Sequence, residues 1–155
     1  MILEDAIAFH AALAPMRPLI GLDLGTVTIG TAVSDRMRSV ATAGKTIRRA
    51  KFTLDANEIL ALAKDREACG FVLGLPLNMD GSEGPRAQST RAFARNFERL
   101  TALPIMLWDE RLSTVAATRA LLEADTSRKR RAEVVESVAA SIILQGMLDR
   151  LGHIK

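Results

Sequence analysis

The sequence predicts one α/β domain whose mixed five-stranded sheet is flanked by helices. The chain has 155 residues, of which 48% are hydrophobic, which suits a single core of ordinary size. Short apolar runs of strand length occur at 19–24, 71–75 and 104–108. Segments with helical spacing alternate with the later runs, which places helices against the sheet.

The first half of the predicted domain contains three strands in succession. They span residues 19–24, 29–33 and 40–47, and no helical segment separates them. Short links of this kind join antiparallel strands, so a purely parallel sheet is disfavoured. Residues 1–17 have some helical character, but Pro15 and Pro18 separate them from the strands, and we expect an N-terminal appendage. Residues 18–155 are then expected to form the single α/β domain.

The second half is predicted to alternate helices with the remaining two strands. Thr53 or Asp55 suits the cap of the first helix, and Ser113 or Thr114 suits the cap of a helix that follows the last strand. In chain order the predicted elements are a helix at 54–68, a strand at 71–75, a helix at 86–100, a strand at 104–108, a helix ending near Leu122 and a helix at 132–151.

Composition excludes several classes of chemistry and of location. Cys69 is the single cysteine, so a disulfide within the chain or a cysteine-based zinc cluster is excluded. His10 and His153 lie near the two ends, which disfavours imidazole catalysis. The sequence shows neither a secretory leader nor an apolar run of membrane-spanning length, so we expect a cytoplasmic protein without a membrane partner.

Carboxylates are therefore the candidate catalytic groups. Asp23 lies inside an apolar strand, where a charge is costly unless it is paired or bound to metal; acceptance of turn amides is the alternative. Asp109 and Glu110 end the fifth strand and face opposite sides, so one of them has a structural role. Glu136 lies on an apolar helical stripe, where an internal partner is the alternative to a site.

These acids would form a metal site only if their elements are adjacent, and spacing in the sequence leaves that open. An all-oxygen site suits Mg²⁺ or Mn²⁺, which activates water and stabilises charge on a scissile phosphate.

Positive charge is modest overall but unevenly distributed. Lys and Arg number 21 against 18 acidic residues, a net charge of +3. One basic group includes Lys45 and Arg48, and a second comprises Arg128, Lys129, Arg130 and Arg131. A solvated surface is the ordinary explanation, and phosphate binding beside the helix of Glu136 is the alternative. The chain has no Tyr and few other aromatics, so binding through the nucleic-acid backbone is favoured over base stacking.

Four motifs resemble one known family. They are Gly21-Leu-Asp-Leu-Gly-Thr-Val-Thr-Ile-Gly30, Gly74-Leu-Pro-Leu-Asn-Met-Asp-Gly81, Asp109-Glu-Arg-Leu-Ser-Thr114 and Ala139-Ala-Ser-Ile-Ile-Leu-Gln145. In this order, over residues 19–150, they resemble the YqgF family, whose members carry the name "putative pre-16S rRNA nuclease".

The resemblance implies an RNase H-like fold, related to the Holliday-junction resolvase RuvC, that brings the first, fourth and fifth strands together. It implies that Asp23 and Glu110 are catalytic, metal-binding acids. Glu136, the third acid expected to be catalytic and to bind metal, stands where the family usually has Asp, so its side chain is longer by one methylene. The implied activity is hydrolysis of phosphodiester bonds in the maturation of pre-16S rRNA, with Mg²⁺ or Mn²⁺, by a monomer or homodimer.

We expect nucleic acid to contact a set of basic and polar side chains, namely Lys45, Arg48, Asn78, Arg111, Arg128, Lys129, Arg130 and Arg131. Three other functions stay open. They are resolution of branched DNA, binding of rRNA without catalysis, and phosphotransfer of the sugar-kinase type, which a single domain disfavours because those enzymes clamp ATP between two.

Overall fold

A six-stranded mixed sheet forms the centre of the molecule, with the strand order β1-β6-β5-β2-β3-β4. The structure is a computed structural model that describes residues 1–113 and 128–154, and for 128–135 the course of the backbone only. Strands β2, β3 and β4 form an antiparallel meander, while β5, β6 and β1 continue the sheet parallel to β2. The strands span Ile2–Leu3, Leu19–Leu24, Thr28–Ser34, Ala41–Arg48, Gly70–Leu75 and Ile105–Asp109.

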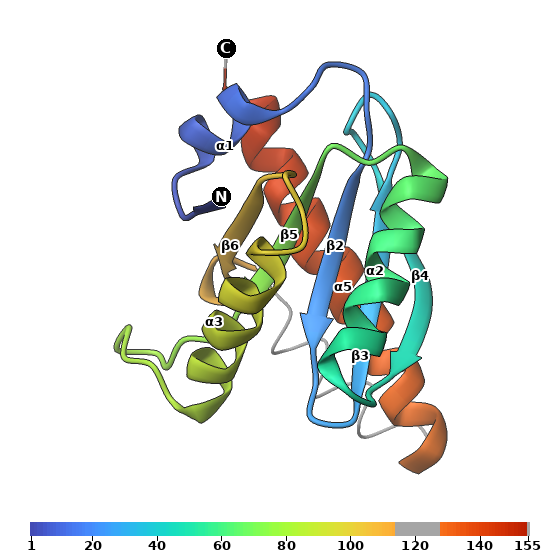
Figure 1. Ribbon diagram of the computed structural model, residues 1–155. Coiled ribbons are helices and arrows are strands. Elements are labelled where there is room, and N and C mark those ends of the chain that lie inside the picture. Colours follow the sequence, from blue (N-terminus) through green and yellow to red (C-terminus); the bar gives the residue numbers. More distant parts are fainter. Residues whose placement is uncertain (114–127, 155) are drawn as a thin grey trace.

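Helices cover both faces of this sheet (Figure 1). Helices α2 and α3 lie on one face, and the long helix α5 crosses the other. In chain order the helices are α1 (Ala6–Ala12), α2 (Phe52–Arg66), α3 (Pro85–Glu98), the 3₁₀ turn η1 (Glu110–Leu112) and α5 (Arg128–Gly152). Among the described residues, no helix combines the length and apolar character that a membrane span needs.

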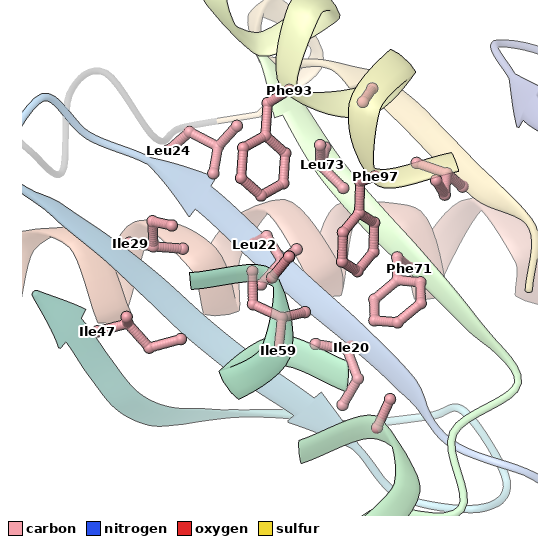
Figure 2. Packing of buried hydrophobic residues seen from close by; sticks show 14 of the residues in the cluster. Ile20, Leu22, Leu24, Ile29, Ile47, Ile59, Phe71, Leu73, Phe93 and Phe97 are labelled. Carbon is pink, nitrogen blue, oxygen red and sulfur yellow. The ribbon is translucent and has the colours of Figure 1, made fainter. Parts of the chain in front are cut away.

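Alternation along the strands divides the core into two layers. On β2, Ile20, Leu22 and Leu24 pack toward α2 and α3. Figure 2 shows this layer, in which Phe71 and Phe97 meet edge to face with ring centroids 4.9 Å apart. The other layer lies beneath α5. Successive residues of one strand therefore face different environments, and this alternation decides which carboxylates share a face.

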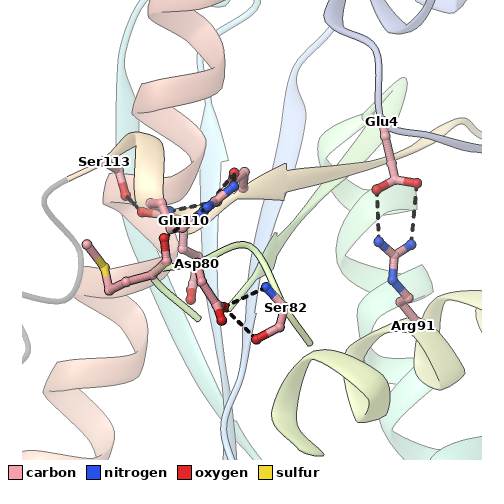
Figure 3. A network of polar contacts seen from close by, with 9 residues as sticks. Glu4, Asp80, Ser82, Arg91, Glu110 and Ser113 are labelled. Carbon is pink, nitrogen blue, oxygen red and sulfur yellow. Dashed lines mark hydrogen bonds and ion pairs between the residues drawn. The ribbon is translucent and has the colours of Figure 1, made fainter. Parts of the chain in front are cut away.

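Residues 1–17 contribute to this fold, which differs from the appendage and the five strands expected. Strand β1 lies parallel to β6, and the amide of Ile105 donates to the carbonyl of Met1 at 2.9 Å. Phe9 of α1 is fully buried in the layer beneath α5. Glu4 pairs with Arg91 of α3 at 3.0 Å (Figure 3). A strand of two residues is too short to show periodicity, so the sequence carries no signal for it.

The start of α2 also differs from the expected capping. Its N-cap is Lys51, whose side chain makes no capping hydrogen bond. Asp55 instead accepts from the amide of Ala50 at 3.1 Å and is buried in the first turn. The helix expected to end near Leu122 falls on residues outside the described part.

Candidate active site

Asp23 lies at the carboxyl end of β2, on the face that α5 covers. The strand is buried along its whole length, and Asp23 is 1% exposed. Gly21, two residues earlier, faces α5, because a Cβ built there would lie 2.7 Å from Cβ of Leu144. Alternation gives Asp23 the same direction. Its partner across the antiparallel pair is Gly30, where a Cβ would collide with the backbone of Glu136.

Glu110 reaches the same face from β6. Met106 and Trp108 of this strand pack beneath α5, and Glu110 continues their alternation. It is 7% exposed, and its Oε1 lies 2.8 Å from the position of a Cβ built at Gly74 of β5. Because β5 pairs with both β2 and β6, the ends that carry Asp23 and Glu110 are separated by one strand. The adjacency of the first, fourth and fifth expected strands is confirmed.

Glu136 approaches the end of β2 from α5. A Cβ built at Gly25 would lie 2.8 Å from its Cδ and 2.9 Å from its Oε1. The absence of a side chain at Gly25 and at Gly30 lets α5 come this close to the sheet. The carboxylate therefore lies against the loop that directly follows Asp23.

The three carboxylates thus occupy one end and one face of the sheet. Within the described part of the chain, however, no three His, Cys, Asp or Glu side chains are grouped closely enough to hold one metal ion. Like charges oppose a closer approach of carboxylates. The donor set still fits Mg²⁺ or Mn²⁺ in kind, since every donor is a carboxylate oxygen on a fixed element.

Asp109 has the structural role that alternation assigns to one of the two adjacent acids. It accepts from the Arg111 guanidinium at 2.8 Å and from the Arg111 amide at 2.9 Å. The hydrogen bonds from Arg111 hold the pKa of Asp109 below its usual 3.8. Arg111 also donates to the carbonyl of Met79 at 3.3 Å, so the Asp109–Arg111 pair stabilises the loop after β5.

That loop is closed by its own polar contacts. Both the amide and the hydroxyl of Ser82 donate to Asp80, and these bonds lower the pKa of Asp80 (Figure 3). Asn78, an expected nucleic-acid contact, donates from Nδ2 to the Ser82 hydroxyl at 3.0 Å. At the left of Figure 3, the Ser113 hydroxyl donates to the carbonyl of Glu110 at 2.9 Å. These contacts hold the loop after β5 and the turn that begins at Glu110.

The expected basic contacts are distributed over different parts of the surface. Lys45 is exposed on the edge strand β4 and lies 3.9 Å from Glu58. Arg48 is exposed at the end of β4, paired in register with Thr28. The run Arg128–Arg131 opens α5, but its side chains lie outside the described residues.

Two further arginines adjoin the end of β2 and were not singled out as site residues. Arg49 donates to the carbonyl of Gly25 at 2.7 Å, and Arg86 donates to the carbonyl of Leu24 at 2.9 Å. The sequence carried one signal for Arg86. It lies directly after Pro85, in the first turn of a helix, where the helix dipole disfavours a cation unless another contact compensates.

A family model and several named relatives match this sequence. The family model described as "RuvX: Holliday junction resolvase" matches residues 17–150. A Ruegeria pomeroyi protein named "Putative pre-16S rRNA nuclease" is 66% identical over 154 residues, covering 99% of this chain and 100% of the relative. A Paracoccus denitrificans protein of the same name is 67% identical over 151 residues, covering 97% and 96%.

Solved structures with the same fold have little sequence in common with this chain. Thermus thermophilus RuvC in complex with a Holliday junction substrate matches with a TM-score of 0.56 at 8% identity, over 90% of this chain and 98% of that one. The yeast mitochondrial Holliday junction resolvase Ydc2 matches with a TM-score of 0.50 at 10% identity, over 96% and 86%. The RNase H-like fold that the motifs implied is confirmed. The chain belongs to the RuvX family, which is the YqgF family that its four motifs resemble.

Proposed function

We propose that this protein is a metal-dependent endonuclease that hydrolyses phosphodiester bonds in the precursor of 16S rRNA, at the maturation of its 5′ end. The observation that carries the proposal is the placement of Asp23, Glu110 and Glu136 at one end and one face of the sheet. The names of the relatives at 66–67% identity support the RNA substrate. The fold alone would not choose between substrates.

In this proposal Asp23, Glu110 and Glu136 would hold Mg²⁺ or Mn²⁺. When bound, such an ion lowers the pKa of a water ligand and stabilises negative charge on the phosphate that is attacked. The chain's own contribution is orientation. Asp23 is buried near the end of β2 and Glu110 directly after β6, where low local polarity strengthens attraction to a cation and packing restricts side-chain motion.

Lys45, Arg48, Asn78, Arg111 and the run Arg128–Arg131 stay candidates for contact with the substrate. Arg111 and Asn78 form hydrogen bonds within the protein, and these bonds stabilise the loop after β5. For the exposed cations, phosphate contacts would make binding dependent on salt and largely independent of sequence.

The decisive test compares carboxylates on the two sides of the sheet. We expect Asp23→Asn and Glu110→Gln each to reduce cleavage of a precursor 16S rRNA fragment by about 100-fold or more, the usual scale for one electrostatic group in an active site. Asp65→Asn is the matched control, because Asp65 is exposed on α2, which covers the other face of the sheet, and it should keep most of the activity. Thermal unfolding should show both catalytic variants folded, and no less stable, since clustered like charge is relieved.

Substrate choice is tested in the same assay with a four-way DNA junction. The description of the family model as a Holliday junction resolvase favours this second substrate. Faster Asp23-dependent cleavage of the junction than of the precursor RNA would reassign the substrate. Tight RNA binding without cleavage, with either Mg²⁺ or Mn²⁺, would instead indicate an assembly factor.

A further inference from the structure

A pocket of about 240 Å³ opens at the end of β2, on the side of the sheet where α3 begins. Its wall combines the loop after Asp23, the end of β4 and the first turn of α3, and the lining residues are Leu24, Gly25, Thr26, Arg49, Pro85, Arg86 and Ser89. These residues bring two guanidinium groups and two hydroxyl groups to a small space, and none of the described residues that line it is acidic.

The two arginines are held in place by the backbone of the loop. Arg49 Nη1 donates to the carbonyl of Gly25, and Arg86 Nη2 donates to the carbonyl of Leu24. Each contact uses one of the five N–H donors of a guanidinium, so further donors stay available. Among the described residues, neither arginine forms an ion pair with a carboxylate. Within the described part of the chain, the two guanidinium groups are therefore positioned by the loop and are not paired with a carboxylate.

The pocket lies directly beside the carboxylate site. Gly25 has the Arg49 guanidinium on its carbonyl and the Glu136 carboxylate within 2.9 Å of its Cβ position. One residue of loop thus separates a negatively charged site from a positively charged pocket. A nucleic-acid strand crossing this loop would present successive phosphates to the two.

We propose that Arg49 and Arg86 form a phosphate-binding subsite, which holds a backbone phosphate next to the scissile one. This inference rests on the proposed function and adds the residues that position the strand. Arginine is suited to the task because its planar fork makes two parallel hydrogen bonds to phosphate oxygens. The subsite contacts only the nucleic-acid backbone, so it fixes the position of the strand and gives no sequence preference.

The test asks whether removing an arginine and neutralising one particular phosphate affect binding through the same contact. A labelled RNA oligonucleotide spanning the cleaved bond is prepared with a single uncharged methylphosphonate, on a 2′-deoxy nucleotide, at each position in turn. Binding is measured with Ca²⁺ in place of Mg²⁺. For the parent protein, neutralising one phosphate beside the scissile bond should weaken binding about 10-fold, the scale of a charge-assisted hydrogen bond.

In Arg86→Gln and in Arg49→Gln, binding of the fully charged RNA should weaken by a similar factor. The methylphosphonate at that one position should then have a smaller effect than in the parent, because only one arginine remains to contact the phosphate, while other positions keep theirs. Arg95→Gln is the matched control, since Arg95 is exposed near the other end of α3. Arg86→Lys keeps the charge without the fork and should lie between parent and Gln variant.

Equal sensitivity to the methylphosphonate in the parent and both Gln variants would overturn the subsite. Thermal unfolding checks that the variants are folded, and the Lys variants replace any Gln variant that is not. Because this experiment measures only binding, a negative result would refute the phosphate subsite without bearing on Asp23-dependent cleavage. Conversely, absence of RNA cleavage would refute the proposed nuclease while the coupling still reported a phosphate subsite.

Discussion

The carboxylate of Glu136 and the backbone of the loop after β2 leave no room for a side chain at Gly25. A Cβ there would lie 2.8 Å from Cδ of Glu136 and 2.8 Å from the carbonyl of Thr28. Contacts this short force one partner to move. The flexible side chain of Glu136 will move more readily than the backbone of Thr28, so a methyl group at Gly25 should displace the carboxylate first.

We therefore expect Gly25→Ala to reduce cleavage by at least about 10-fold, since a small misplacement of a catalytic group is costly. Glu136→Asp alone should keep or raise activity, because it restores the usual family residue. Adding Glu136→Asp to Gly25→Ala should restore part of the activity, and only part, because the clash with Thr28 persists. Single-turnover cleavage measures all three.

Gly84→Ala is the matched control for this series. Its nearest neighbour, Asn78 Oδ1, lies 3.7 Å from the built Cβ, which is an ordinary contact. A loss of activity in Glu136→Asp as large as that in Glu136→Ala would contradict the assignment of Glu136 to the site.

At the scale of elements, the Asp109–Arg111 pair joins the end of β6 to the loop between β5 and α3. The pKa of Asp109 is lowered mainly by hydrogen bonding to Arg111. A carboxyl whose folded pKa lies below its unfolded value stabilises the protein above the unfolded value of 3.8, and this contribution is lost as pH falls through the folded pKa.

Asp109→Asn should consequently lower the free energy of unfolding at pH 7, by less than about 1 kcal/mol because the pair is partly exposed and screened. The difference between parent and variant should vanish at a pH below the folded pKa of Asp109. Urea denaturation at pH 7 and near pH 2 measures it. Asp65→Asn, an exposed acid on α2, is the control, and a difference that persists unchanged at low pH would refute the role of this ion pair.

Considered as a whole, the molecule uses its first residues to complete the layer beneath α5. Phe9 is fully buried there, whereas Ile7 on the same short helix is 58% exposed. Phe9→Ala should lower the free energy of unfolding by about 3–5 kcal/mol, the range for emptying a large buried aromatic site. Ile7→Ala should change it by less than about 0.5 kcal/mol. Urea unfolding of both variants measures these changes. If residues 1–17 were only an appendage, the two substitutions would lower the free energy of unfolding equally.

The sequence predicted the parts of the molecule that depend on local pattern. The strand of Asp23, the opposed directions of Asp109 and Glu110 and the helix of Glu136 all follow from periodicity, because alternation is a property of the backbone. Their adjacency came from family resemblance, since strand order depends on contacts between residues far apart in the chain. Arg49 resembled other surface cations, and only its bond to Gly25 distinguishes it.

Helix α5 follows every other described element in the chain, yet it covers the face built from the earliest strands. Gln145 on this helix accepts from the amide of Ala41, 104 residues earlier, and donates to the carbonyl of Ser39. Contacts between residues so far apart in the chain form late in folding, because the entropy lost in closing the long loop is not offset until the elements pack together. Until α5 has been synthesised, the apolar surface of β2 and β3 that it covers therefore stays exposed, and Glu136 is not yet in place. If Asp23, Glu110 and Glu136 form the active site proposed above, a polypeptide still growing on the ribosome has no assembled carboxylate site, and RNA cleavage begins only after α5 has been synthesised.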